Sequence, residues 1–532
     1  MNEHENSFYF LKKGFGVMST QPEWLDNAVF YEIYPQSFKD SNADGIGDFQ
    51  GIIEKLDYIR ELGCTAIWMN PCFESPFGDA GYDVSDYYKA APRYGTNEDL
   101  KRLFEEVHER DMHILLDLVP GHTSVQHKWF QESMKAEKNE YTDRYVWTDS
   151  IWEEVQGMGS LRGISDRDGS CAVNFFSHQP ALNYGFYKPN RPWQQSMDDD
   201  GPKATLEEMK NIMRFWLNMG ADGFRVDMAG SLVKHDEEGK GTIRLWQNVR
   251  AFLDREFPDA AMVSEWGEPD KSLQGGFHMD FTLHFGPSHY NDLFRCPTPY
   301  FSSKGEGNIS DFVSKYRESY EKSERKGLIC IPSGNHDMDR LARRIHGDEL
   351  KIAFAFLLSM PGAPFIYYGD EIGMRYVENL TSVEGGYNRT GSRSPMQWDA
   401  SVNAGFSDAS KEKLYILQDE SPDKPTVENQ MQDENSLYNE IKRLIAVRMS
   451  HKALQSKGEI EFVNVGYPLA YVRSSSNQKI FVVINPAAEE KVFDCNYLPI
   501  ECIYHFGGEI SANGISVNVP AQSAGFYRIE NI

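Results

Sequence analysis

Polar side chains that can perform acid–base chemistry stand at the ends of several short apolar runs in the 532-residue sequence. They form three pairs and one single acid: Asp117 with His122, Arg225 with Asp227, His336 with Asp337, and Glu265. One such acid alone is more often a helix cap or a surface charge than a catalytic group. Together they indicate a site at which carboxyl groups and histidines act as general acids, general bases or nucleophiles.

Eight apolar, β-branched or aromatic runs alternate with segments of helical period between residues 28 and 371. The runs are Val29–Tyr34, Thr65–Asn70, His113–Val119, Gly223–Met228, Ala261–Trp266, Met279–Phe285, Leu328–Ser333 and Pro364–Tyr368. Segments such as Gly51–Leu62 and Glu207–Met219 carry their apolar residues on one helical face. Eight strand–helix units predict a parallel (β/α)8 barrel, whose chemistry lies at the carboxyl ends of the strands. The candidate residues follow the third, fourth, fifth and seventh runs, so we expect them on one rim.

Two further folding units are expected outside the barrel. Between the third and fourth runs lie roughly 100 residues, which is far longer than an ordinary strand–helix connection. After an amphipathic helix near Ser436–Ser450, the sequence changes to short alternating strands such as Leu469–Arg473 and Ile480–Ile484. The sequence therefore predicts an α/β fold: a (β/α)8 TIM barrel (24–122 and 186–450), an inserted small domain after strand 3 (123–185) and a C-terminal all-β sandwich (451–532).

Four motifs resemble, in order and spacing, the signature regions of the α-amylase family of glycoside hydrolases. They are DLVPGH at 117–122, GFRVD at 223–227, VSEW at 263–266 and GNHD at 334–337. Stretches at 47–51, 81–87, 179–183 and 394–399 are also similar, so that the resemblance spans residues 26 to 450. It implies the same barrel, inserted domain and C-terminal sandwich, and a retaining mechanism.

By this resemblance Asp227 is the nucleophile, Glu265 the acid/base and Asp337 the third acid, which holds the sugar hydroxyl groups. Arg225 precedes Asp227 by two residues on a strand, so both side chains point the same way and the guanidinium can keep Asp227 ionised. Glu265 stands beside Trp266, whose apolar ring could raise the pKa of the carboxyl group, as a proton donor requires. The alternative for Arg225 and Asp227 is a structural ion pair inside the barrel.

Further sugar-binding residues are implied by the same resemblance. His122 and His336 correspond to histidines that hydrogen-bond the reacting sugar, and Tyr82 to the aromatic platform beneath it. Asp83 and Arg393 resemble an Asp–Arg pair that closes the pocket behind the terminal glucose in the α-glucosidase, oligo-1,6-glucosidase and trehalose synthase branch. Such a pair predicts an exo-acting enzyme, whereas the alternative is a surface salt bridge of little energetic consequence.

A loop after the first run predicts a structural calcium site. Asp40, Asn42, Asp44, Asp48 and the carbonyl of Ile46 alternate around a turn-forming glycine, like the first half of an EF-hand loop. α-Glucosidase relatives carry a calcium loop of this pattern at this place. The twelfth position, Ile52, lacks the bidentate glutamate, and an acidic turn is the alternative.

Two departures from the family pattern limit what the motifs imply. Gly121 stands where an asparagine often precedes the histidine of the first motif, which argues against the family's other calcium site. Met228 follows the nucleophile and matches neither the valine of α-1,6-preferring relatives nor the smaller or polar residue of α-1,4 enzymes, so the linkage cannot be read from it.

Composition restricts the partners. A formal net charge of −26 and a pI of about 5.0 argue against nucleic acid or an anionic membrane, both of which need a basic surface. A neutral oligosaccharide fits better. Seven scattered cysteines without a CxxC pair, and a start without an apolar stretch of signal-peptide length, predict a soluble cytoplasmic protein.

The leading functional hypothesis is an exo-acting α-glucosidase that hydrolyses short malto- or isomalto-type oligosaccharides through a covalent glucosyl-enzyme. Transfer or isomerisation, as in trehalose synthases, uses the same catalytic residues and differs in how well the acceptor site excludes water. An endo-acting α-amylase is a third possibility. A non-catalytic binding domain is disfavoured because the acids are all present.

Overall fold

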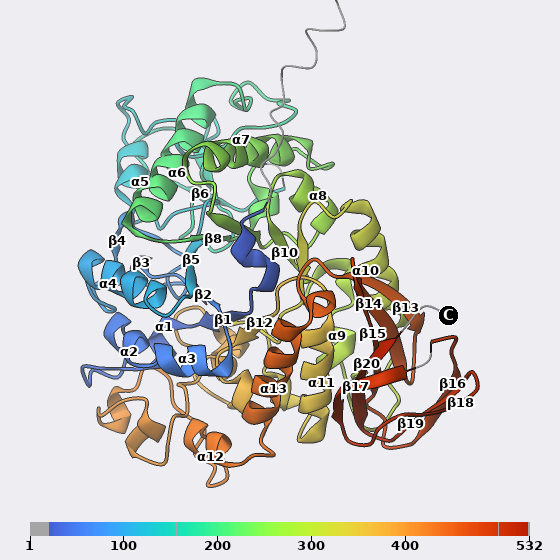
Figure 1. The fold of residues 1–532 in the computed structure, drawn as a ribbon. Helices are drawn as coiled ribbons and strands as arrows, with labels where there is room; N and C mark the ends of the chain where they lie inside the picture. Colours follow the sequence, from blue (N-terminus) through green and yellow to red (C-terminus); the bar gives the residue numbers. More distant parts are fainter. Residues whose placement is uncertain (1–20, 156, 498, 530–532) are drawn as a thin grey trace, which may run out of the picture.

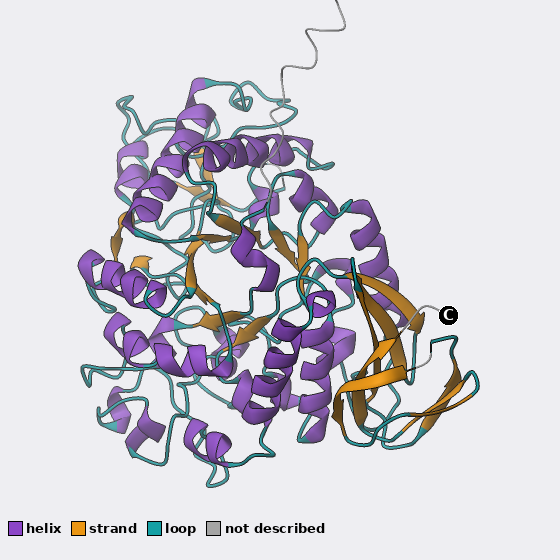
Figure 2. Ribbon diagram, viewed as in Figure 1, coloured by secondary structure: helices purple, strands orange, loops and turns teal. Residues whose placement is uncertain are grey.

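The computed structural model describes residues 21–155, 157–497 and 499–529, and its centre is a barrel of eight parallel strands (Figure 2). In sheet order the strands are β11 (Leu328–Cys330), β10 (Met279–Phe281), β9 (Ala261–Ser264), β8 (Gly223–Val226), β5 (His113–Leu118), β2 (Ala66–Met69), β1 (Phe30–Ile33) and β12 (Phe365–Tyr367). A parallel bridge between Pro332 and Phe365 closes the ring. The predicted (β/α)8 fold is confirmed, and each predicted run contains one of these strands.

Alternation along the strands separates two apolar layers. Phe30, Val263 and Met279 belong to the cluster inside the barrel, whereas Tyr31 and Met262 pack outward against the helices. Since successive strand residues point to opposite faces, a polar residue in register with an inner apolar one also points inward. That register aims the side chains of the strand ends into the mouth of the barrel. Each fully buried large apolar side chain stabilises the fold by roughly 1.5–3 kcal/mol.

Helices surround the barrel (Figure 1). They are α2 (Phe49–Glu54), α3 (Leu56–Leu62), α4 (Asn97–His108), α6 (Asp200–Met219), α7 (Lys240–Glu256), α8 (Pro269–Gln274), α10 (Ser310–Lys322), α11 (Asp348–Ser359) and α13 (Leu437–Ser450). The loops add α1 (Pro35–Phe38), α9 (Asn291–Phe294) and α12 (Val427–Gln432). The expected helix Gly51–Leu62 is interrupted at Lys55, whose φ of −113° and ψ of 4° leave the helical region. None of the helices in the described ranges is both long and apolar enough to cross a membrane.

Two irregular segments lie at the mouth of the barrel. The hairpin β3 (Phe73–Glu74) and β4 (Asp86–Ala90) follows β2 and was not predicted. Between β5 and α6 the chain forms α5 (Lys128–Ser133) and the hairpin β6 (Ser160–Arg162) and β7 (Ser170–Ala172), with a small apolar cluster around Val146 and Phe186. This is the expected place of the inserted domain, although its boundaries at 123 and 185 stay a prediction.

The C-terminal part is all β, as predicted. One sheet contains β13 (Glu459–Asn464), β14 (Leu469–Ser475), β15 (Gln478–Asn485), β20 (Ser523–Ile529) and β17 (Pro499–Phe506). The other contains β16 (Lys491–Asp494), β19 (Ser516–Val519) and β18 (Ser511–Asn513). Apolar residues of both sheets, among them Phe481 and Val517, share one cluster. Strands β16, β17 and β18 were not predicted. The expectation of a start without a signal peptide falls on residues 1–20, outside the described residues.

Candidate active site

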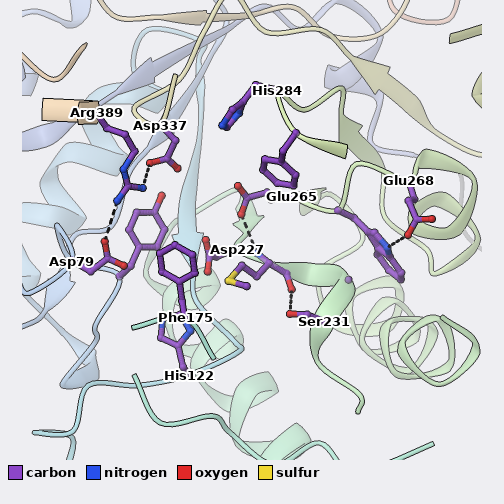
Figure 3. Close-up of a pocket in the computed structure, with 15 residues that line it drawn as sticks. Asp79, His122, Phe175, Asp227, Ser231, Glu265, Glu268, His284, Asp337 and Arg389 are labelled. Atoms are coloured by element: carbon purple, nitrogen blue, oxygen red, sulfur yellow. Dashed lines mark hydrogen bonds and ion pairs between the residues drawn. The ribbon is translucent and has the colours of Figure 1, made fainter. Parts of the chain in front are cut away.

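A cavity of about 600 Å³ opens at the carboxyl ends of the barrel strands, a size that suits a small ligand. Five predicted site residues line it (Figure 3): Tyr82, His122, Asp227, Glu265 and Asp337. The barrel therefore brings together residues that are up to 255 positions apart, from 82 to 337, as the strand order predicted.

One guanidinium contacts both predicted catalytic carboxyl groups. Arg225 Nη1 lies 3.2 Å from Asp227 Oδ1, and Nη2 lies 3.0 Å from Glu265 Oε2. Nη1 also lies 2.9 Å from Asp117 Oδ1. Burial raises the pKa of Asp227 well above its usual value and nearby Glu265 adds to the rise, although Arg225 opposes it. Arg225 therefore favours the ionised form of Asp227, which burial and the neighbouring Glu265 disfavour.

The third acid is held ionised by cations. Burial alone would raise the pKa of Asp337, but His336, Arg393 and Arg389 outweigh it and hold the pKa well below its usual value. Arg389 Nη1 and Arg393 Nη2 donate to Asp337 Oδ1 at 2.6 and 2.9 Å. Burial disfavours the charged imidazole of His336, but Asp337 and Glu32 outweigh this and raise its pKa to about 9. Asp337 is thus an anion among fixed donors, a suitable acceptor for sugar hydroxyl groups.

Tyr82 and His122 also line the cavity. The Tyr82 ring stacks on His336 with centroids 5.4 Å apart, and its hydroxyl donates to Asp117 Oδ2 at 3.1 Å. Burial lowers the pKa of His122 to about 3, so the imidazole is neutral. Its Nδ1 lies 3.1 Å from the Asn174 amide nitrogen. Both side chains offer uncharged hydrogen-bonding groups beside an aromatic face, which is the chemistry that a sugar ring requires.

Asp83 and Arg393 do not form the predicted pair, so that expectation is wrong. The Asp83 carboxylate is fully buried and accepts hydrogen bonds from the backbone N–H groups of Gly78 and Asp79 and from Ser75 Oγ. Arg393 is equally buried and donates to the His336 carbonyl and to Asp337. Asp83 therefore shapes its own loop, and Arg393 supports the third acid from behind.

Another Asp–Arg pair stands where the predicted one was expected. Arg389 Nη2 lies 3.8 Å from Asp79 Oδ1, and both side chains line the cavity. Gln179 donates to the other Asp79 oxygen at 2.7 Å. Each residue lies four positions before its predicted counterpart, Asp83 or Arg393, just ahead of the matching stretch at 81–87 or 394–399. The motifs therefore located the right loops, but the residue within each loop depends on its turn geometry, which spacing does not give.

Several residues of the cavity were not predicted as binding residues. They are Asp79, Phe175, Met228, Gly230, Ser231, Trp266, Glu268, His284, Phe285 and Arg389. The side chains on the far side of Glu265 include Glu268, which accepts a hydrogen bond from Trp266 Nε1 at 3.3 Å and pairs with Lys271 at 2.8 Å (Figure 3). Met228, Trp266, His284 and Phe285 lie in the predicted runs Gly223–Met228, Ala261–Trp266 and Met279–Phe285, whereas the others lie outside the runs and no periodicity marks them.

Comparison with known proteins identifies the family. The model of the alpha amylase catalytic domain matches residues 32–457. The chain belongs to the alpha-amylase family. It is 32% identical to the trehalose synthase/amylase TreS of Mycolicibacterium smegmatis over 90% of this chain and 84% of that one. The oligo-1,6-glucosidase of Bacillus cereus is 30% identical, over 91% and 95%.

A solved structure extends the likeness to three dimensions. A MutB variant in complex with the substrate sucrose superposes with a TM-score of 0.78 and 25% identity, over 96% of this chain and 100% of that one. As a member of the family, the chain is an enzyme that acts on glucosidic bonds.

The loop predicted to bind calcium is folded by its own hydrogen bonds. Asp40 Oδ1 accepts from the backbone N–H groups of Asn42 and Ala43, and Oδ2 from that of Gly45. Asp44 accepts from the N–H of Ile46, and Asp48 from that of Ser41. The three carboxylates do not lie within 4.8 Å of one another, and the described residues contain one such group of ligands, His289, Asp292 and Asp311, elsewhere. This arrangement does not fit an ion held by all three acids, and calcium stays a prediction.

Proposed function

We propose that the enzyme transfers single glucosyl units from the non-reducing end of short α-glucosides through a covalent glucosyl-enzyme. The observation that carries this proposal is the placement of Asp227 and Glu265 on one guanidinium beside a charged cluster of Asp79, Arg389 and Asp337. The carboxyl pair can break the glycosidic bond, and the charged cluster can recognise the terminal sugar.

The proposed reaction has two steps. The Asp227 carboxylate attacks the anomeric carbon while Glu265 gives its proton to the glycosidic oxygen, so that the C–O bond breaks and the aglycone leaves as an alcohol. Glu265 then removes a proton from water or from a sugar hydroxyl, whose oxygen attacks the anomeric carbon and releases Asp227. Asp337 accepts hydrogen bonds from the sugar hydroxyl groups throughout, and Arg225 limits the charge that builds up on the pair.

The exo-acting preference rests on the shape of one end of the cavity. Arg389 reaches both Asp79 and Asp337, and Figure 3 shows these three residues on one side of Asp227 and Glu265. A charged cluster there can hydrogen-bond the terminal glucose, and it blocks the path of a longer chain. An endo-acting enzyme needs that path open. We therefore disfavour α-amylase action on the interior of starch.

Hydrolysis is the leading outcome of the second step, and transfer to a sugar is the alternative. The alternative is favoured by two apolar side chains, Trp266 and Phe285, that line the cavity together with Glu268. Phe285 is 51% exposed and is therefore available for contact with a ligand. Such side chains can hold the leaving sugar and exclude water until the sugar attacks again. The names of the relatives, trehalose synthase among them, support the same alternative.

A substrate panel tests the proposal. Maltose, isomaltose, sucrose, trehalose and soluble starch are incubated separately with the protein, and products are separated by chromatography. We expect glucose or a rearranged disaccharide from at least one disaccharide and little product from starch. Rapid loss of the starch–iodine colour with little glucose, or no reaction with any of the five, would contradict the proposal.

We also propose a cytoplasmic location. All seven cysteines are unpaired in the structure, and five of them are buried. Free thiols at this frequency suit a reducing compartment. Fractionation of the source cells, with a cytoplasmic marker enzyme as reference, tests this assignment, and recovery in an exported fraction would contradict it.

A further inference from the structure

A buried acid outside the cavity is directed at the turn that carries Glu265. Asp280 lies in β10, paired in register with Ser264, the last residue of β9. Its neighbours Met279 and Phe281 point into the barrel, so Asp280 points outward, away from the cavity. The side chain is fully buried.

The hydrogen bonds of Asp280 go to both sides of Glu265. Asp280 Oδ1 lies 2.7 Å from Ser264 Oγ, 3.2 Å from the backbone nitrogen of Trp266 and 3.3 Å from that of Gly267. Its other oxygen, Oδ2, is buried without a hydrogen-bond partner among the described residues. The hydrogen bonds to Oδ1 thus come from Ser264, which precedes Glu265, and from Trp266 and Gly267, which follow it.

Asp280 is one of several anchors of this turn, because the Glu265 N–H also donates to the Val226 carbonyl and the Glu265 carbonyl accepts from the Ala229 N–H. Strand β9 ends at Ser264, and the chain reverses at Gly267, where φ is +74° and an added Cβ would lie 2.9 Å from Leu283 Cδ1. The side chain of Glu265 is held by Arg225 and by the Met228 N–H, whereas Asp280 holds the Ser264 hydroxyl before it and the backbone N–H groups of Trp266 and Gly267 after it. A buried carboxyl group costs stability unless its hydrogen bonds compensate, and burial raises the pKa of Asp280 to about 7. The hydrogen bonds from Ser264, Trp266 and Gly267 explain why a carboxyl group that costs stability is buried at this position.

We propose that Asp280 is a positioning residue, which fixes the backbone of the Ser264–Gly267 turn so that the Glu265 carboxyl group meets the glycosidic oxygen. The inference rests on the proposed function, because it assumes that Glu265 is the acid/base. Proton transfer requires the donor within hydrogen-bond reach of the oxygen, and a displacement of about 1 Å can lower the rate on the order of 100-fold.

The test separates a positioning role from a structural one by the leaving group. Two substrates are compared: α-glucosyl fluoride, whose leaving group needs little protonation, and the disaccharide that the wild type cleaves fastest. For Asp280→Ala we expect kcat/KM to fall about 10- to 100-fold for the disaccharide and far less for the fluoride. Asp280→Asn keeps an acceptor oxygen for the three donors and should restore most of the disaccharide value.

Glu371 provides a matched control. It is another fully buried acid whose pKa burial raises to about 7, and it accepts hydrogen bonds from Tyr31 and Tyr58, away from Glu265. Glu371→Gln should change thermal stability without changing the ratio of the two kcat/KM values. An equal loss on both substrates in Asp280→Ala, or no loss, would overturn the proposal.

Two further variants cover the remaining outcomes. If Asp280→Ala does not fold, Ser264→Ala, which removes one of the three donors, decides: a smaller loss confined to the disaccharide supports the proposal, and no selective loss overturns it. Glu265→Gln is measured in parallel. If it shows no selective loss, the proposed function itself fails, whereas a selective loss in Glu265→Gln but not in the Asp280 variants removes only the positioning role.

Discussion

Two aspartates four residues apart in one loop should respond in opposite ways to the same substitution. Asp79 lines the cavity and contacts Arg389, while Asp83 is fully buried and accepts three hydrogen bonds from its own loop. Asparagine has nearly the same shape as aspartate in both places. Asp79→Asn therefore removes a charge from the sugar site, and Asp83→Asn turns one acceptor oxygen into a donor.

The magnitudes follow from these contacts. A hydrogen bond to a charged group contributes about 1.5–3 kcal/mol, so Asp79→Asn should lower kcat/KM roughly 10- to 150-fold with little change in unfolding. In Asp83→Asn the new amide group faces an N–H or O–H donor, such as the Gly78 N–H, which is 2.8 Å from Oδ2 in the wild type. At least one buried donor then lacks an acceptor, at a cost of about 1–3 kcal/mol of folding free energy.

The assay measures kcat/KM on the best disaccharide and unfolding in urea for both variants. The expected result is lost activity with normal stability for Asp79→Asn, and lost stability with near-normal activity for Asp83→Asn at a temperature where it is folded. The reverse pattern would refute the account and restore the pair of Asp83 and Arg393 that the motif suggested. Lost activity without lost stability in both variants would show that the loop geometry is wrong.

Three further predictions concern stability and stereochemistry. Burial raises the pKa of Glu371 from 4.5 to about 7, so in this pH range the folded state binds more protons than the unfolded state and wild-type stability falls as pH rises. The difference in unfolding free energy between Glu371→Gln and the wild type should therefore shift in favour of the variant by up to about 3 kcal/mol from pH 4 to pH 8. A difference that does not depend on pH would contradict this. If the Asp40–Asp48 loop binds calcium, a chelator should lower the Tm of the wild type by ligand linkage. A wild-type Tm that does not change with chelator, and that Asp44→Ala does not change either, would exclude calcium binding by this loop. Hydrolysis should first release α-glucose, as polarimetry or NMR can follow, whereas β-glucose would exclude retention.

The barrel was predictable because its strands carry a simple physical signal. Runs such as His113–Val119 and Ala261–Trp266 are mainly apolar, as parallel strands covered on both faces require. The edge strands of the C-terminal part carry a weaker signal. In β18 (Ser511–Asn513) all three residues are exposed, so no apolar pattern marks it. The break at Lys55 was also unpredictable, because the residues on both sides of it share one apolar stripe.

The site was predictable to the extent that strand ends determine it. Asp227 and Glu265 extend strands β8 and β9, so their direction follows from the strand register. Asp79 and Arg389 lie in loops, where turns rather than register set the direction of each side chain. Asp83 lies within the matching stretch at 81–87 and Asp79 just before it, and only the backbone N–H groups directed at the Asp83 carboxylate reveal that Asp83 is turned away from the cavity.

The most direct test of the mechanism is to trap its intermediate. Glu265→Gln removes the general base, so α-glucosyl fluoride should still load Asp227 while release becomes slow. Mass spectrometry of the acid-quenched, digested variant should then find one glucosyl residue on the peptide that contains Asp227, and azide, which needs no general base, should discharge it as α-glucosyl azide. A glucosyl residue on another side chain, or turnover of the fluoride by Asp227→Ala at the wild-type rate, would contradict the assignment of Asp227 as the nucleophile.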